Sequence, residues 1–194
     1  MPKILVFAGS ARRDSLNKKL ARAVADEIAA QAAEATFLDL DDYPMPVYHG
    51  DLESREGMPE NSKRLREIFI AHDALAIASP ENNQSITSLL KNTIDWLSRG
   101  VGDGKGANSG LAPYRGKVAA LFAASPGPYG GVRHLPQLRQ SLGGLGVLVI
   151  GPQLALIHAD QAFDEAGRLR DPGVARAMKG VVTELVETAG RTRG

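Results

Sequence analysis

The sequence predicts an α/β fold, in which a doubly wound, five-stranded parallel sheet is covered by helices on both faces in three layers, α/β/α. Short, continuous apolar runs rich in β-branched residues recur along the chain, and segments with apolar residues at helical spacing lie between them. The two kinds of segment alternate, as right-handed crossovers require. No internal repeat or linker divides the 194 residues, so we expect one domain, 1–194.

The predicted strands are unbroken apolar runs rather than alternating ones. Such runs suit strands that are buried on both faces, as in parallel sheets. The predicted strands are residues 4–7, 35–40, 74–78, 117–122 and 147–150.

The predicted helices lie between these strands and after the last one. Their apolar positions are Leu16, Leu20, Ala23, Val24 and Ile28; Leu65, Ile68 and Phe69; Leu90, Ile94 and Leu97; and Leu135, Leu138 and Leu142. A final helix is predicted over residues 172–191, with Pro172 near its first turn. Its apolar set is expected to pack on the sheet, and consists of Val174, Met178, Val181, Val182 and Leu185.

Two connections are longer than the usual length of about four to six residues. Residues 41–58 are acidic and contain Pro44 and Pro46, whereas residues 99–116 contain six glycines. The second is expected to be a mobile surface insertion, or else a lid or a subunit contact, near the substrate entrance.

Composition excludes several classes of function. The 23 basic and 22 acidic residues give a formal charge of +1, which argues against a nucleic-acid partner. The absence of cysteine excludes disulfides, thiolate metal sites and a thiol nucleophile, so redox chemistry would need a bound cofactor. The four histidines have no metal-ligand spacing, and no G-x-S-x-G motif occurs. Apolar runs are too short to span a membrane and no signal peptide is evident, so we expect a cytoplasmic protein.

The loop after the first strand, residues 9–17, is predicted to bind an anion. It contains neither a dinucleotide fingerprint nor a P-loop. It does offer Ser10, Ser15 and Asn17 beside the free N–H groups of a helix start, and Arg12 adds positive charge. Ser15 could simply cap the helix and the arginines could be solvated. Together, at the carboxyl end of a strand, these groups favour phosphate.

The loops after the third and fourth strands are predicted to bind a flat heteroaromatic ring. Pro80 stiffens the first loop, and the glycines of residues 125–131 allow a backbone to approach a ring closely. Asn82 and Asn83 are also ordinary turn residues. Tyr129 could stack on the ring or shield the loop, and Trp96 is assigned to the core.

These motifs resemble the NADPH-dependent FMN reductase family, most of all its chromate, quinone and azo-compound reductase branch. The family pattern G-S-x-R-x-x-S-x-N matches residues 9–17. Its P-E-Y-N pattern matches at Pro80, Glu81 and Asn83, and L-K-N-x-x-D-W matches residues 90–96. A small Gly-rich loop matches residues 125–131, and the resemblance covers roughly residues 3–150.

The resemblance implies a flavodoxin-like fold, with FMN as cofactor and NADPH or NADH as co-substrate. It also implies ping-pong hydride transfer to quinones or similar acceptors (FMN, chromate, azo compounds), with no catalytic side chain and no metal, in a homodimer or homotetramer. The FMN phosphate would be held by Ser10, Arg12, Ser15, Leu16 and Asn17. The isoalloxazine ring would be held by Pro80, Glu81, Asn82, Asn83, Ser125, Pro126, Gly127 and Gly130.

The chain departs from the family pattern at two positions in the second loop. Asn82 stands where the family usually has Tyr, so an aromatic contact near the flavin is lost, which bears on acceptor preference. Thr87 stands where Pro is common.

Two other functions remain open at this point. One is a flavodoxin-type electron carrier without small-molecule turnover, although such carriers are commonly strongly acidic. The other is a flavin-free relative that binds a different phosphate ligand.

Overall fold

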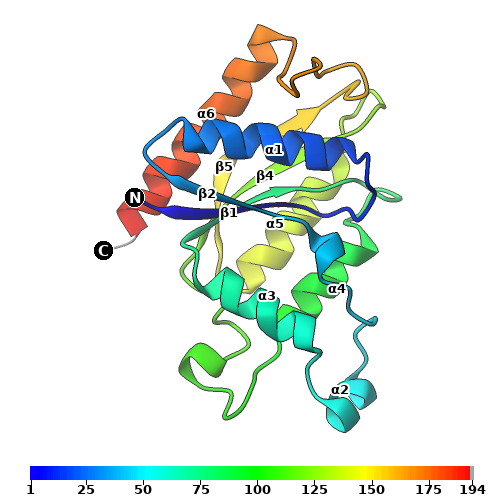
Figure 1. The fold of residues 1–194 in the computed structure, drawn as a ribbon, viewed down its shortest axis with the longest axis vertical. Helices are drawn as coiled ribbons and strands as arrows, with labels where there is room; N and C mark the ends of the chain where they lie inside the picture. The colour runs from blue at the N-terminus through cyan, green and yellow to red at the C-terminus, as the bar shows by residue number, and fades with distance from the viewer. Residues whose placement is uncertain (193–194) are drawn as a thin grey trace.

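The computed structural model describes residues 1–192, and its centre is a five-stranded sheet (Figure 1). The strand order is β2-β1-β3-β4-β5, and all neighbouring strands are parallel. The strands are β1 (Lys3–Ala8), β2 (Glu34–Leu38), β3 (Ala74–Ala78), β4 (Val118–Ala124) and β5 (Leu148–Leu156). This order belongs to the flavodoxin-like type of doubly wound sheet and confirms the predicted fold class.

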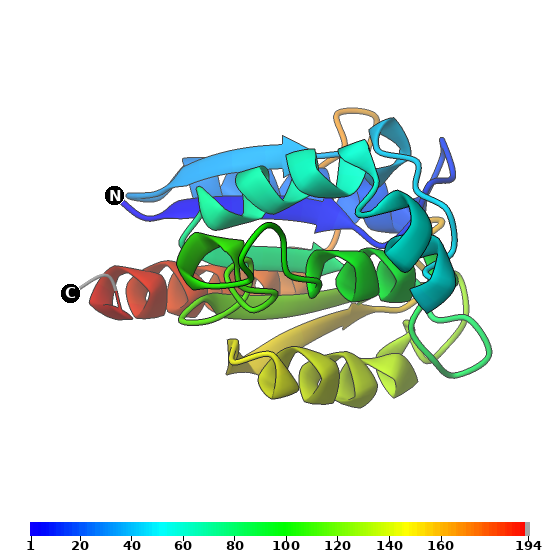
Figure 2. The same ribbon diagram turned by 90° about the horizontal axis from the view of Figure 1, so that it is seen from below.

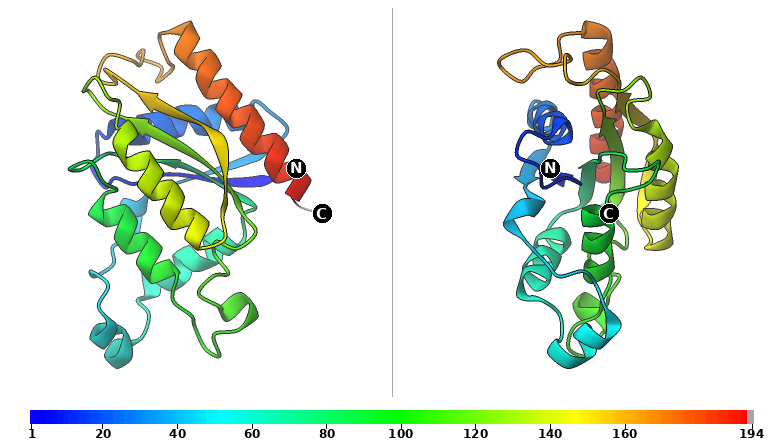
Figure 3. Two further views of the ribbon diagram at one scale, coloured as in Figure 1. Left: turned by 180° about the vertical axis from the view of Figure 1, so that it is seen from behind. Right: turned by 90° about the vertical axis from the view of Figure 1, so that its right-hand side faces the viewer.

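Helices cover both faces of the sheet. On one face lie α1 (Leu16–Ala29) and α6 (Pro172–Thr192); on the other lie α3 (Glu60–Ile70), α4 (Ser88–Leu97) and α5 (Leu135–Gly144). Figure 2 looks onto the second face, and the left panel of Figure 3 shows α6 running alongside β5. The predicted final helix therefore packs on the sheet as expected.

Alternate side chains of each strand enter different cores. Ile4 and Val6 of β1 pack with α1 and α6, whereas Leu5 and Phe7 pack with α3, α4 and α5. Both sets are buried, so the central strands consist of unbroken apolar residues.

The edge strand β5 is longer than the sequence predicts. The apolar run ends at Ile150, but the strand continues through Gly151 and Pro152 to Leu156. The register against β4 shifts between Ala119 and Leu121, after which pairing resumes with Gln153. An edge strand tolerates Pro152, because on its unpaired side there is no neighbouring strand to which a missing N–H would have donated.

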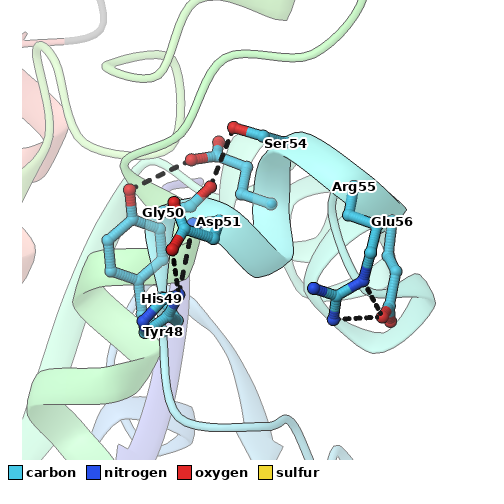
Figure 4. Close-up of polar contacts among 8 residues, drawn as sticks. Tyr48, His49, Gly50, Asp51, Ser54, Arg55 and Glu56 are labelled. Carbon is cyan, nitrogen blue, oxygen red and sulfur yellow. Dashed lines mark hydrogen bonds and ion pairs between the residues drawn. The ribbon is translucent and has the colours of Figure 1, made fainter.

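Residues 41–58 contain a short helix that the sequence did not predict, α2 (Gly50–Glu56), which has no buried residue. Side chains outside the helix hold it in place. The Tyr48 hydroxyl donates to Glu53 at 3.0 Å (Figure 4), and Arg99 donates to the same carboxylate at 2.9 Å. These bonds from Arg99 lower the pKa of Glu53 below its usual value. The Tyr48 ring meets buried Trp96 edge-on at 5.0 Å, which confirms Trp96 as a core residue.

The Gly-rich connection, residues 99–116, lies at the amino-terminal edge of the sheet, because it joins the end of α4 to the start of β4. The expectation that it lies near the substrate entrance is therefore wrong, since ligand sites of such folds lie at the opposite edge. The buried guanidinium of Arg66 fastens it, donating to the carbonyls of Leu97 at 2.6 Å and Ser109 at 2.8 Å.

Within the described residues, every helix is too short or too polar to cross a bilayer.

Candidate functional site

A cleft of about 360 Å³ opens at the carboxyl ends of β1, β3 and β4. The predicted site residues that line it are Ser10, Arg12, Ser15, Leu16, Asn17, Pro80, Glu81, Asn82, Ser125 and Pro126. Asn83, Gly127 and Gly130 do not line it. The lining residues that sequence reasoning missed are Gly9, Ala11, Thr87, Ser88, Leu89 and Ala124. Three loops that are far apart in sequence therefore meet around one cavity, as the order of elements predicted.

The first wall of the cleft is the start of α1. Ser15 caps the helix, accepting a hydrogen bond from the backbone N–H of Lys18 at 3.4 Å. Among the described residues, none accepts a hydrogen bond from the backbone N–H of Leu16 or Asn17. Helix N-termini with open N–H groups attract anions, because the helix dipole is positive there.

Two further groups of this wall are close to the open N–H groups in sequence. The Ser10 hydroxyl accepts from the N–H of Arg12 at 3.3 Å, and the exposed Arg12 guanidinium donates to the carbonyl of Asp14 at 2.9 Å. Arg12 is thus held at the rim with most of its donors free.

The side chain of Asn17 has a different position from the one predicted. It is buried, donates to the carbonyl of Ala124 at 2.8 Å and accepts from the N–H of Ala124 at 2.9 Å. The amide therefore ties α1 to the end of β4. Only the backbone N–H of Asn17 remains for a ligand.

The second wall contains a tight turn from Asn82 to Ser85. Two backbone hydrogen bonds of 3.0 Å close it, and Asn83 and Gln84 both have positive φ, 52° and 64°. Asparagine tolerates this conformation, so Asn83 has the turn role, while Asn82 lines the cleft. Gln137 of α5 fastens the turn, with bonds of 2.7 Å to Ser85 and 3.0 Å to the carbonyl of Gln84.

Glu81 joins the second loop to the third. Its carboxylate accepts from the backbone N–H of Arg133 at 2.9 Å and lies 2.7 Å from the Arg133 guanidinium. That guanidinium also lies over the ring of Tyr129, 4.8 Å from its centre, and Tyr129 is 61% exposed. The Glu81 carboxylate is thus committed to positioning the third loop.

The third loop, residues 125–131, is fixed against β5. The N–H of Ser125 donates to the carbonyl of Leu156 at 3.1 Å, and the Ser125 hydroxyl accepts from the N–H of Gly127 at 3.2 Å. Gly130 has a φ of 59°, and a Cβ there would lie 2.9 Å from the backbone of Ala155. Gly130 therefore allows a close approach of two backbones beside the cleft, rather than an approach to the cavity itself.

Buried His134 anchors the end of the third loop. Its Nδ1 lies 2.6 Å from the carbonyl of Gly131, whereas its Nε2 has no partner within the described part of the chain. Burial lowers the pKa of His134. The neutral ring, donating from Nδ1, is the form that this environment favours.

Thr87 connects the first and second walls. Its hydroxyl donates to the carbonyl of Gly9 at 2.7 Å and accepts from the N–H of Leu90 at 3.1 Å, which caps α4. A threonine directly before a helical pattern is a capping signal, so this role could have been found in the sequence.

The donor set fits FMN. Open N–H groups and serine hydroxyls gather at one wall, as a terminal phosphate requires, and the rigid turns at the other two walls supply backbone groups for a ring. No group of three metal-ligating side chains occurs in residues 1–192.

Comparison with known proteins gives relatives of one kind. The sequence pattern of the NADPH-dependent FMN reductase family matches residues 2–161. A quinone reductase of Pseudomonas putida is 34% identical over 169 residues, which is 87% of this chain and 84% of the relative. An NAD(P)H-dependent FMN reductase of Pseudomonas aeruginosa is 34% identical over 194 residues, covering 99% of this chain and 97% of the relative.

Solved structures agree with this assignment. FerB of Paracoccus denitrificans, a flavoenzyme NAD(P)H:(acceptor) oxidoreductase, superposes with a TM-score of 0.81 at 30% identity, over 99% of both chains. A flavodoxin from the domain Archaea superposes with a TM-score of 0.62 at 12% identity, over 97% of this chain and 99% of the flavodoxin, which shows a shared fold only. The chain belongs to the NADPH-dependent FMN reductase family.

Proposed function

We propose that this protein is an FMN-dependent NAD(P)H oxidoreductase that reduces quinones or similar acceptors. The observation that carries the proposal is the cleft where the open N–H groups of Leu16 and Asn17 face two rigid polar loops. Family membership and the quinone and FMN reductases among its relatives support the same chemistry.

The phosphate end of FMN would bind at the start of α1. The backbone N–H groups of Leu16 and Asn17 and the hydroxyls of Ser10 and Ser15 would donate to phosphate oxygens, and Arg12 would add charge from the rim. Asn17 contributes through its backbone, because its side chain is bonded to Ala124.

The ring end would bind between the second and third loops. FMN bound there would supply the redox chemistry, which is hydride transfer from NAD(P)H to the acceptor. Pro80, Asn82, Ser125 and Pro126 line this part of the cleft. Glu81, Asn83, Gly127 and Gly130 act by shaping the two loops.

The protein itself would bind, orient and shield the reactants. In the third loop the backbone N–H groups of Ser125, Gly127 and Gly130 are already bonded within residues 1–192, so those of Tyr129 and Gly131 would remain for a ligand. No side-chain acid or base is required, and one accessible face used by two substrates in turn implies ping-pong kinetics.

An electron carrier is the less favoured alternative. The similarity to the archaeal flavodoxin is one of fold, and the formal charge of +1 differs from the acidic surface common in carriers. The relatives matched over most of their length are reductases.

Assembly and location are further parts of the proposal. We expect a cytoplasmic homodimer or homotetramer without a nucleic-acid partner. Light scattering coupled to size exclusion would show a single monomeric mass if this expectation is wrong.

A spectrum of the purified protein tests the function directly. We expect visible flavin absorption that NAD(P)H bleaches without oxygen and that an added quinone restores, with parallel lines in double-reciprocal plots. Intersecting lines would contradict the ping-pong scheme. If neither NADH nor NADPH bleaches the flavin absorption, the electron-carrier alternative would be favoured.

A pair of variants tests the phosphate wall. Arg12→Ala combined with Ser15→Ala should weaken FMN by about 1.5 to 3 kcal/mol for each charged hydrogen bond lost, and riboflavin much less. Arg13→Ala is the matched control, because Arg13 lies in the same loop but does not line the cleft. Equal losses for FMN and riboflavin would refute the assignment.

A further inference from the structure

Lys18 is a buried cation directly behind the candidate phosphate wall. It is only 7% exposed although it lies in the first turn of α1. Its Nζ lies 2.7 Å from the carboxylate of Asp39 and donates to the carbonyl of Ala11 at 3.2 Å. Ala11 itself lines the cleft.

Lys18 joins three separate pieces of the chain. Its backbone N–H donates to the capping hydroxyl of Ser15, and its side chain reaches back to the loop at Ala11. Asp39 directly follows β2, and its second oxygen accepts from the N–H of Asp41 at 3.0 Å. The loop is therefore held from behind by one side chain whose counter-ion is itself fixed.

Such a pair is poorly explained by stability alone. Burying the Lys18 ammonium beside Asp39, whose side chain is 23% exposed, costs desolvation energy, and well-packed apolar residues often stabilise a fold equally well. The neighbouring Lys19 is exposed and forms no ion pair within residues 1–192. The buried location of Lys18 therefore points to a role at the adjacent cleft.

We propose that Lys18 is a positioning residue for the phosphate of the flavin cofactor, with Asp39 as its counter-ion. It holds residues 10–14 against the start of α1, so that the N–H groups of Leu16 and Asn17 stay open to the cleft. This inference rests on the proposed function, because it requires FMN at this site. It concerns binding of the phosphate and leaves the ring contacts unchanged.

The test compares two ligands that differ only in the phosphate. Dissociation constants of FMN and riboflavin are measured by fluorescence quenching with flavin-free full-length protein, for the wild type, Lys18→Met, Lys18→Arg and Asp39→Asn. Lys19→Met is the matched control, since it removes the adjacent charge of the same helix. Circular dichroism and a thermal melt confirm that each variant is folded.

We expect Lys18→Met to weaken FMN by at least about tenfold, the size usual for a charge-assisted hydrogen bond, and riboflavin by less than about twofold. Lys18→Arg should restore most of the loss, and Lys19→Met should change neither ligand. Asp39→Asn removes a negative charge near the phosphate but keeps an acceptor for Lys18, so FMN should bind at least as tightly.

Two results would overturn the proposal: an unchanged ratio of FMN to riboflavin affinity in Lys18→Met, whether both ligands or neither bind more weakly, or an equal loss of FMN affinity in Lys19→Met. If Lys18→Met does not fold, Lys18→Gln decides by the same comparison, because it also removes the charge; an unchanged ratio of FMN to riboflavin affinity in that variant would contradict the proposal. A wild-type protein that binds neither flavin would instead refute the proposed function.

Discussion

The side-chain amide of Asn17 forms two hydrogen bonds with the backbone of Ala124, at 2.8 Å and 2.9 Å, across 107 positions of sequence. The amide donates one of these bonds and accepts the other, so a single side chain pairs both the N–H and the carbonyl of Ala124 at the end of β4. This contact fixes the start of α1, with its open N–H groups, against the strand from which the third loop begins.

The first prediction concerns this contact. Asn17→Leu leaves the buried N–H and carbonyl of Ala124 unpaired, so the free energy of unfolding should fall by about 2 to 4 kcal/mol. Urea unfolding measures the change. Asn17→Asp is the matched variant, because it keeps the acceptor and loses the donor, and we expect it to lose stability as well, since its buried carboxylate faces the carbonyl of Ala124. Stability equal to the wild type in Asn17→Leu would show that the contact is dispensable.

The second prediction concerns Thr87, which bonds Gly9 and caps α4. Thr87→Val keeps the shape but removes both bonds, so stability should fall by about 2 to 3 kcal/mol. Thr87→Ser keeps the hydroxyl and should lose far less. Chemical unfolding of both variants side by side checks this, and equal losses would mean that the methyl group contributes as much to stability as the hydroxyl.

The third prediction concerns Asn82, which is exposed and lines the cleft. Its turn is closed by backbone bonds, so Asn82→Tyr should leave the turn and FMN affinity nearly unchanged. The larger ring should narrow the cleft and lower kcat/KM for bulky relative to small quinones by about threefold or more. Asn82→Ala is the small-side-chain control. An unaltered ratio in the Tyr variant would place residue 82 in solvent without effect, and a large loss of FMN would show that it holds the ring.

The fourth prediction concerns pH. Burial lowers the pKa of His134 below its ordinary value of 6.5, and the bond to Gly131 and the nearby Glu81 carboxylate oppose this only in part. The unfolded chain therefore binds the proton more readily than the folded chain. Stability from the neutral ring is fully present above pH 6.5 and is lost as pH falls toward the folded-state pKa.

Urea unfolding at about pH 7.5 and about pH 5.5 measures this dependence in the window where histidine titrates. The wild type should be less stable at the lower pH, and the difference should shrink in His134→Gln, which has no ring to protonate. A pH dependence that is the same in both proteins would show that His134 titrates normally.

The fifth prediction concerns cofactor choice. FMN should bind more tightly than FAD, because Ser10, Arg12 and Ser15 suit a terminal phosphate. Fluorescence quenching titrations with both flavins check this. Equal or tighter FAD binding would contradict the assignment of the phosphate wall.

Local pattern was enough to predict the five strands and the five long helices in their order, although it missed α2 and the extension of β5. Continuous apolar runs indicated the central strands, because a strand buried on both faces has no polar positions. Apolar residues at helical spacing indicated α1, α3, α4, α5 and α6, because only one stripe of each helix packs on the sheet. The rule that parallel strands place their carboxyl ends at one edge then brought the three loops together. For the same reason, ten of the predicted site residues line one cleft.

The direction of individual side chains depended on partners that are distant in sequence. The Asn17 side chain bonds the backbone of Ala124, at the end of β4, rather than a ligand. The Glu81 carboxylate pairs with the guanidinium of Arg133. Both partners belong to elements that are distant in sequence. The extension of β5 beyond Pro152 likewise depends on pairing with β4.

The sequence by itself therefore determined the doubly wound α/β class of this protein and the edge at which its cleft lies, because both follow from short-range periodicity and chain direction, while the flavodoxin-like topology came from the resemblance to a family. Only the tertiary structure decided which polar groups remain open in that cleft. An N–H or a carboxylate is free or paired according to what the rest of the fold brings within about 3 Å of it, and no local pattern records that distance.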